Sequence, residues 1–146
     1  QEQVFERVLR LCTECGNKVL TIHSVRAASK VITHLERSLT SGSCIPILHW
    51  FTGTPAEARR ATDIGCYFSI NAAMFGSEKG KALVAKLPLD RILTETDGPF
   101  IDIQGRSSRP LDVKGVVASL AKLRKTSPEE MRRQILANLG AVTRAS

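Results

Sequence analysis

Three side chains able to bind a metal stand at the ends of short apolar segments of this chain. His23 ends the first of these segments, His49 ends the second, and Asp97 follows the fourth. Two imidazoles and a carboxylate suit zinc, manganese or iron, and further carboxylates would also admit magnesium. If the fold brings these three ends together, the residue types predict a divalent metal site.

A second acid lies two residues before Asp97, in the run Leu93-Thr94-Glu95-Thr96-Asp97-Gly98-Pro99. The Gly-Pro pair interrupts the strand and leaves Asp97 at the rim of the sheet, where parallel α/β folds carry out their chemistry. Strand alternation places Glu95 on the opposite face from its two threonine neighbours, so we expect it to support a ligand rather than bind metal itself. We expect Asp97 to be the main catalytic residue.

The elements that must position these side chains alternate between helix and strand. Apolar residues recur at helical spacing between the short apolar runs, and Thr54-Pro55-Ala56-Glu57 is a capping box with proline at the first helical position. The stretch from 98 to 110 is rich in Gly, Ser, Arg and Pro and is typical of a polar loop. The pattern predicts strands over 19–23, 45–49, 67–70 and 92–96, and helices over 3–15, 26–39, 54–65, 77–86, 111–125 and 127–139.

The fold class that follows is α/β. Short strands that are apolar on both faces and separated by helices indicate parallel βα units with crossover helices. Four strands fit either a small open sheet or half of a closed (β/α)8 barrel, and the order of the elements does not choose between them. In a barrel all strand ends lie on one rim, so His23, His49 and Asp97 would converge there.

Composition narrows the class of protein. The 146 residues carry a net charge of +7 with a pI near 9.6, which favours anionic partners such as nucleic acid, although acidic membranes fit the same charge. No apolar stretch approaches the roughly 20 residues that span a bilayer. Four cysteines without a signal peptide favour free thiols in a reducing cytoplasm. We expect one domain, and a chain that starts at Gln1 inside an amphipathic helix is expected to begin partway through something larger.

Four motifs occur in an order that resembles a known family. They are Gln3-x-Phe5, then Ile22-His23-Ser24 with Arg26-Ala27, then His49-Trp50-Phe51-Thr52-Gly53, then the run from Leu93 to Pro99. This order is similar to that of TatD-type metal-dependent deoxyribonucleases, and the resemblance covers nearly the whole chain. Within that family, the TatD-like nucleases of bacterial Qat-type anti-phage systems look most similar.

The resemblance implies a TIM-like (β/α)8 barrel of which residues 1–146 form the C-terminal half. It implies metal-dependent hydrolysis of DNA phosphodiesters by a metal-activated water, often from the 3′ end. His23 and His49 would bind one metal, and Asp97 would hold or share the metal and orient the attacking water. The complete enzyme would hold two divalent ions, of magnesium, manganese or zinc.

The chain also departs from that family. The first metal ligands of the family, an H-x-H pair and a glutamate, lie before the point at which this chain begins. Relatives often carry arginine two residues after the strand-end histidine, where this chain has Val25, with Arg26 one place later. Because two-metal chemistry needs more than three protein ligands, we expect the segment alone to have severely reduced activity. Its open sheet edges would need a cover, namely the missing N-terminal half, a companion chain or a second copy.

Candidate contacts to DNA lie near the predicted metal site. Arg26 and Trp50 follow the two histidines, and Arg106 and Arg109 lie in the loop after Asp97. Arginine would bind the phosphate backbone, and Trp50 would stack on a base. Two other functions fit the same residues: a non-catalytic half-barrel that binds nucleic acid or acts as a scaffold, and a metal-dependent hydrolase of a small molecule, since fold does not fix function.

Overall fold

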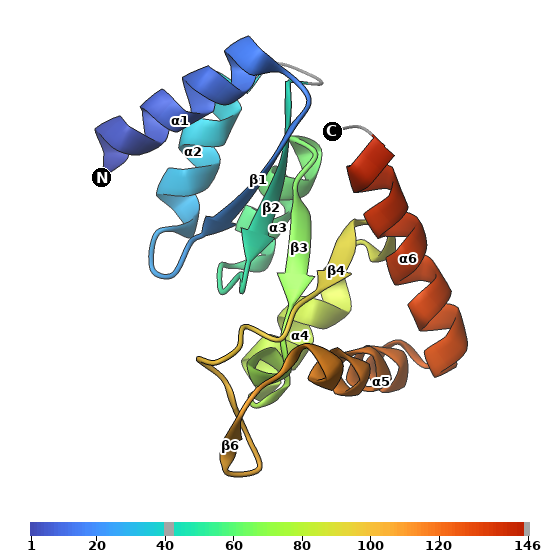
Figure 1. Cartoon of the computed structure of the whole chain (residues 1–146). Helices are drawn as coiled ribbons and strands as arrows, with labels where there is room; N and C mark the ends of the chain where they lie inside the picture. Colours follow the sequence, from blue (N-terminus) through green and yellow to red (C-terminus); the bar gives the residue numbers. More distant parts are fainter. Residues whose placement is uncertain (40–42, 145–146) are drawn as a thin grey trace.

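The computed structural model describes residues 1–39 and 43–144, and its centre is a four-stranded parallel sheet (Figure 1). The order in the sheet is β1-β2-β3-β4, the same as the order in the chain. The strands are β1 (Lys18–His23), β2 (Cys44–His49), β3 (Tyr67–Ile70) and β4 (Ile92–Thr94). The predicted α/β class is confirmed.

Six α-helices in the described residues connect and follow the strands. A capping box starts one of them: the Thr54 hydroxyl accepts a hydrogen bond from the Glu57 amide, and the Glu57 carboxylate accepts one from the Thr54 amide. The helices are α1 (Glu2–Cys15), α2 (Ala28–Ser38), α3 (Pro55–Asp63), α4 (Glu78–Lys86), α5 (Val113–Arg124) and α6 (Pro128–Arg144), with short 3-10 turns η1 (Ala72–Phe75), η2 (Leu89–Arg91) and η3 (Pro110–Asp112).

Three segments differ from the sequence prediction. The fourth strand ends at Thr94 rather than at residue 96, because the backbone turns toward Asp97, whose φ is 49°. The last helix continues through Gly140 to Arg144, since its final turn packs Val142 against the sheet. The predicted loop contains a small hairpin of β5 (Asp102–Ile103) and β6 (Arg106–Ser107). The other bounds agree within a residue or two.

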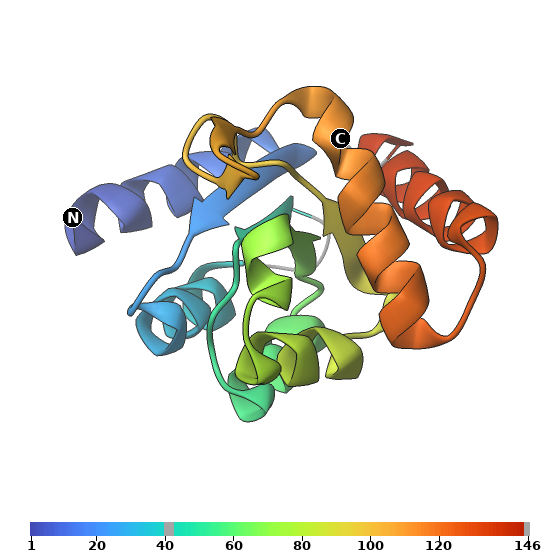
Figure 2. The ribbon, with the colours of Figure 1, turned by 90° about the horizontal axis from the view of Figure 1, so that it is seen from below.

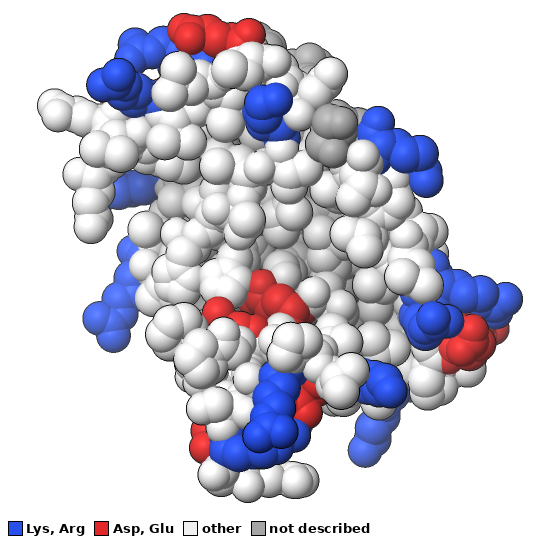
Figure 3. Space-filling view, viewed as in Figure 1, with Lys and Arg blue, Asp and Glu red and all other residues white. Residues whose placement is uncertain are grey.

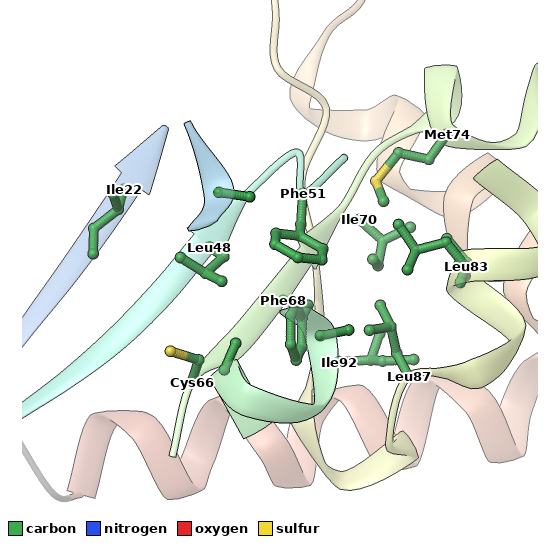
Figure 4. Packing of buried hydrophobic residues seen from close by; sticks show 14 of the residues in the cluster. Ile22, Leu48, Phe51, Cys66, Phe68, Ile70, Met74, Leu83, Leu87 and Ile92 are labelled. Carbon is green, nitrogen blue, oxygen red and sulfur yellow. The ribbon is translucent and has the colours of Figure 1, made fainter. Parts of the chain in front are cut away.

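One face of the sheet is fully covered by helices. Leu48, Phe68, Ile70 and Ile92 are each completely buried on this outer face, and Figure 4 shows them in one cluster with side chains of the α4 region. Burying a side chain of this size stabilises the fold by about 1.5–3 kcal/mol. In Figure 2, helices α2 to α5 curve around this side of the sheet.

The other, inner face of the sheet is only partly covered. Ile45 and Ile47 are partly buried there, and Val19 is 38% exposed. The end of α6 packs Val142 against Tyr67 and Leu93, two buried side chains of this face. In the described residues β1 pairs only with β2, and β4 only with β3, so both edges of the sheet are open. Helices on one face and an open curve are the geometry of a barrel segment. No helix within the described ranges is long and apolar enough to cross a membrane.

Candidate metal centre

The predicted ligands do meet at the rim where the four strands end. His23 and His49 are register partners on neighbouring strands, with ring centroids 5.2 Å apart. Asp97, three residues beyond the end of β4 at Thr94, reaches His49 from the other side. Parallel strands bring their carboxyl ends to one edge, so residues far apart in the chain lie together.

His49 lies between two carboxylates. Its Nδ1–H donates to Glu95 Oε2 at 2.5 Å, and its Nε2 lies 3.3 Å from Asp97 Oδ1. The bond to Glu95 places the proton on Nδ1, so Nε2 keeps the lone pair that a metal requires. The ring therefore presents its free nitrogen on the same side as the Asp97 carboxylate.

The separation of these two atoms fits a shared cation. Two ligand atoms bound tetrahedrally at about 2.1 Å lie about 3.4 Å apart, close to the 3.3 Å between His49 Nε2 and Asp97 Oδ1. The side chains of Glu95 and Asp97 are only 16% and 14% exposed, and His49 is the sole ion-pair partner that the described residues give them. A divalent ion would neutralise these two charges, which are otherwise costly to hold so close together.

Charge on the surface follows the same arrangement. Figure 3 shows acidic side chains recessed near the ends of the strands, with Lys and Arg at the margins of that face. Most of the face between them carries no charge. These recessed acidic side chains contrast with the net charge of +7 for the whole chain.

The residues present supply one side of a site. Within 1–39 and 43–144, no three His, Cys, Asp or Glu side chains gather closely enough to enclose an ion. His23 is exposed, and its ring is tilted by 40° against that of His49. Zinc, manganese or magnesium bound here would need at least one ligand from outside the described residues or from water.

Asn71 is a member of this cluster that sequence reasoning missed. Its Nδ2 donates to Glu95 Oε1 at 3.0 Å, the side chain is completely buried, and its Oδ1 has no hydrogen-bond partner. Asn71 directly follows β3 and lies two residues beyond Ser69, the register partner of His49, so a polar residue just past a strand end was the available signal. Because its side chain is a neutral amide, Asn71 does not stand out among the ionisable residues that bind metals.

Strand alternation does not explain why Glu95 would support a ligand rather than bind metal itself. Glu95 lies on the same face of the sheet as Leu93, and this is the face of the two histidines. Its carboxylate is taken up by His49 on one oxygen and by Asn71 on the other. Glu95 is thereby placed to orient a ligand, because both of its oxygens are already used.

A strap after β4 holds the Asp97 backbone. The Phe100 amide donates to the Asp97 carbonyl at 2.9 Å, and the Ser108 hydroxyl donates to the Thr96 carbonyl at 2.8 Å. A Cβ at Gly98 would collide with the Ser108 carbonyl, so this close approach requires glycine. Asp97 is fixed from both sides of its position in the chain.

The four residues predicted to contact DNA differ in their surroundings. Arg26 and Trp50 follow β1 and β2 with positive φ values of 55° and 43°, and both stand at the rim. Arg106 makes two hydrogen bonds of 2.7 Å to Asp112, and that guanidinium holds the pKa of the Asp112 carboxyl well below its ordinary value. Arg106 thus braces the loop, whereas the Arg109 side chain is exposed.

The chain is similar in sequence to a known family and to proteins within it. Residues 1–143 match the profile of the family described as TatD related DNase. YabD of Bacillus subtilis, an uncharacterized metal-dependent hydrolase, is 31% identical over 90% of this chain and 52% of its own length. The 3′-5′ ssDNA/RNA exonuclease TatD of Cronobacter sakazakii is 33% identical over 75% of this chain and 42% of its own.

A solved structure supports the same grouping. The TatD homologue YjjV of Escherichia coli superposes with a TM-score of 0.72 and 28% identity, over 82% of this chain and 48% of that protein. The shared fold confirms the predicted half-barrel. The chain spans about half the length of the curated relatives it matches.

Proposed function

The chain belongs to the TatD related DNase family, and we propose that it is the C-terminal half of a metal-dependent deoxyribonuclease that hydrolyses DNA phosphodiesters. The observation that carries the proposal is His49, held by Glu95 so that its free nitrogen and the Asp97 carboxylate lie 3.3 Å apart. The relative named as a 3′-5′ exonuclease supports attack from the 3′ end. Four free cysteines suit a cytoplasmic enzyme.

His23, His49 and Asp97 would hold a divalent ion together with ligands from outside these residues, and the ion would supply Lewis-acid chemistry that makes a water nucleophilic at neutral pH and neutralises phosphate charge. Asp97 would orient the attacking water and accept its proton on the carboxylate. Glu95 holds the imidazole in one tautomer and one orientation, and Asn71 holds Glu95. The side chains at the ends of β2, β3 and β4 form a connected row, namely Asp97, His49, Glu95 and Asn71.

The rest of the site would come from the other half of the barrel. Two-metal phosphoryl chemistry needs ions about 4 Å apart and more ligands than three side chains supply. The partly exposed inner face and the two open sheet edges support a partner that completes the ring. That partner is the N-terminal half on the same chain or a companion chain, and the segment alone is expected to be nearly inactive.

The test is nucleotide release from 3′-labelled single-stranded DNA by the full-length protein with magnesium, manganese or zinc. Asp97→Asn is expected to reduce release to background, while Glu95→Gln keeps measurable activity because it removes no ligand. Asp90→Asn is the matched control, since Asp90 is 70% exposed and lies in η2, at the opposite end of β4.

Other outcomes would favour the other two functions. A wild-type protein that binds DNA but cleaves none with any divalent metal, and whose binding survives Asp97→Asn, would establish a scaffold or binding module instead. Cleavage of a small phosphodiester with no cleavage of DNA would point to a hydrolase of small molecules.

A further inference from the structure

A second hollow opens on the rim beside the metal centre. It has a volume of about 150 Å³ and lies between the segment after β2 and the η1–α4 segment after β3. Its walls include Trp50, Thr52, Met74, Ser77, Lys79 and Leu83. Because Trp50 directly follows His49, this pocket adjoins the candidate ligands.

The pocket does not depend on whatever covers the open sheet edges. Its walls come from the loops of the two middle strands, β2 and β3, whereas the unpaired edges are β1 and β4. It therefore stays at the surface of the completed barrel. This distinguishes it from the two hollows beside α6, of which one borders β4 at Thr94 and the other crosses the inner face of the sheet from Thr21 to Thr94.

The walls of the pocket are held firmly. Phe51 is completely buried and packs edge-on against Phe68 with centroids 5.4 Å apart, which anchors the backbone next to Trp50. Gly80 lets α4 approach the Met74 carbonyl, because a Cβ there would collide with that oxygen. Trp50 itself is partly buried and keeps a face toward the pocket.

The pocket combines an apolar lining with a free cation. Lys79 is exposed, and no carboxylate in the described part of the chain lies within salt-bridge distance of it. Lys81, two residues later on the same helix, is instead paired with Glu78 at 2.7 Å. A flat π-system beside a phosphate matches this pairing of an indole with an unpaired ammonium.

We propose that this pocket is a nucleotide subsite: Trp50 stacks on the base next to the scissile phosphodiester, and Lys79 contacts an adjacent phosphate. The inference rests on the proposed nuclease function and extends it to the substrate class, a single strand with an unstacked base. Stacking accepts any base, because every base has a π-face, so the subsite recognises nucleotides without reading sequence.

Fluorescence gives a direct test, because Trp50 is the one tryptophan of the 146 residues. Full-length protein carrying Asp97→Asn is titrated with a short oligothymidylate and with an abasic strand of equal length. Subtracting the signal of the same protein with Trp50→Phe isolates the Trp50 emission. The oligothymidylate should quench this emission, and the abasic strand should leave it unchanged.

Kinetics on the full-length protein separate the subsite from the metal centre. Trp50→Ala should raise the KM for an oligonucleotide about 10-fold. The KM for bis(p-nitrophenyl) phosphate should rise much less, because this substrate is too small to reach both the metal centre and the pocket. Trp50→Phe should recover most of the loss. Lys79→Ala should raise the oligonucleotide KM several-fold, and the matched Lys81→Ala should leave it unchanged.

Two results would overturn the inference while the nuclease function stands. One is cleavage of DNA without any change in Trp50 emission. The other is an equal rise of both KM values in Trp50→Ala. If the full-length protein neither binds nor cleaves DNA with any divalent metal, the proposed function itself fails, and the subsite fails with it.

Discussion

The two faces of the sheet differ in how completely their side chains are buried. On the outer face Leu48, Phe68 and Ile92 are completely buried under helices. On the inner face Ile47, the sequence neighbour of Leu48, is only partly buried, and Val19 is 38% exposed. The candidate metal centre lies at the end of the inner face.

The difference shows how stability and chemistry are divided. A fully packed outer face supplies most of the hydrophobic stabilisation within these residues. The inner face contributes side chains that become useful when a second surface meets them. An enzyme built in this way can hold a precise half-site before the other half is in place.

The largest expected effect compares two neighbours on β2. In the full-length protein Leu48→Ala and Ile47→Ala should each lower the free energy of unfolding by about 2–5 kcal/mol, because both sites would then be buried. In the 146-residue chain Leu48→Ala should cost the same, whereas Ile47→Ala should cost about 1 kcal/mol. Urea denaturation of both forms measures the four values. Equal losses for the two variants in the short chain would contradict the contrast between the faces.

A smaller effect concerns the rim. Glu95→Gln keeps the size of the side chain but weakens its hold on His49, so metal affinity should fall about 10–100-fold. Isothermal titration of manganese into full-length protein measures it, with unfolding followed in parallel. Glu129→Gln, at an exposed position of α6, is the matched control. Unchanged affinity in Glu95→Gln would remove Glu95 from the centre.

The smallest effect concerns α6, the helix that reaches the inner face. The amide and hydroxyl of Ser127 and the hydroxyl of Thr126 donate to Glu130 and lower the pKa of its carboxyl to about 2. Since this pKa lies below its ordinary value of 4.5, the stabilisation is present above that value and is lost as pH falls toward 2. The melting temperature of Glu130→Gln should therefore be lower than that of the wild type at pH 6, and the difference between the two should narrow toward pH 3. A difference independent of pH would show that the charge contributes nothing.

The sequence predicts the strand ends well because two signals agree there. Each strand is a short apolar run closed by a polar residue, and β3 has the predicted bounds. Position alone therefore places His23 and His49 at the ends of β1 and β2, while Asp97 lies three residues beyond β4. The end of α6 was missed because Gly140 resembles a helix stop, while Val142 beyond it is buried by tertiary packing.

The rest of the site depends on pairings between distant segments. Asn71 matters because Glu95 lies across from it, and Arg106 braces its loop because Asp112 folds back onto it. No local spacing encodes either contact. Burial likewise sets the pKa of two thiols. It raises the pKa of Cys66 to about 12 and that of Cys44 to about 11.

The strand order β1-β2-β3-β4 also has a consequence for biosynthesis. Each strand pairs with the one made just before it, so every ladder can form soon after its second strand leaves the ribosome. In the proposed barrel, the seam between β4 and the first strand of the other half joins the most distant segments and would close last. The four strands of this half would then be paired before that seam forms.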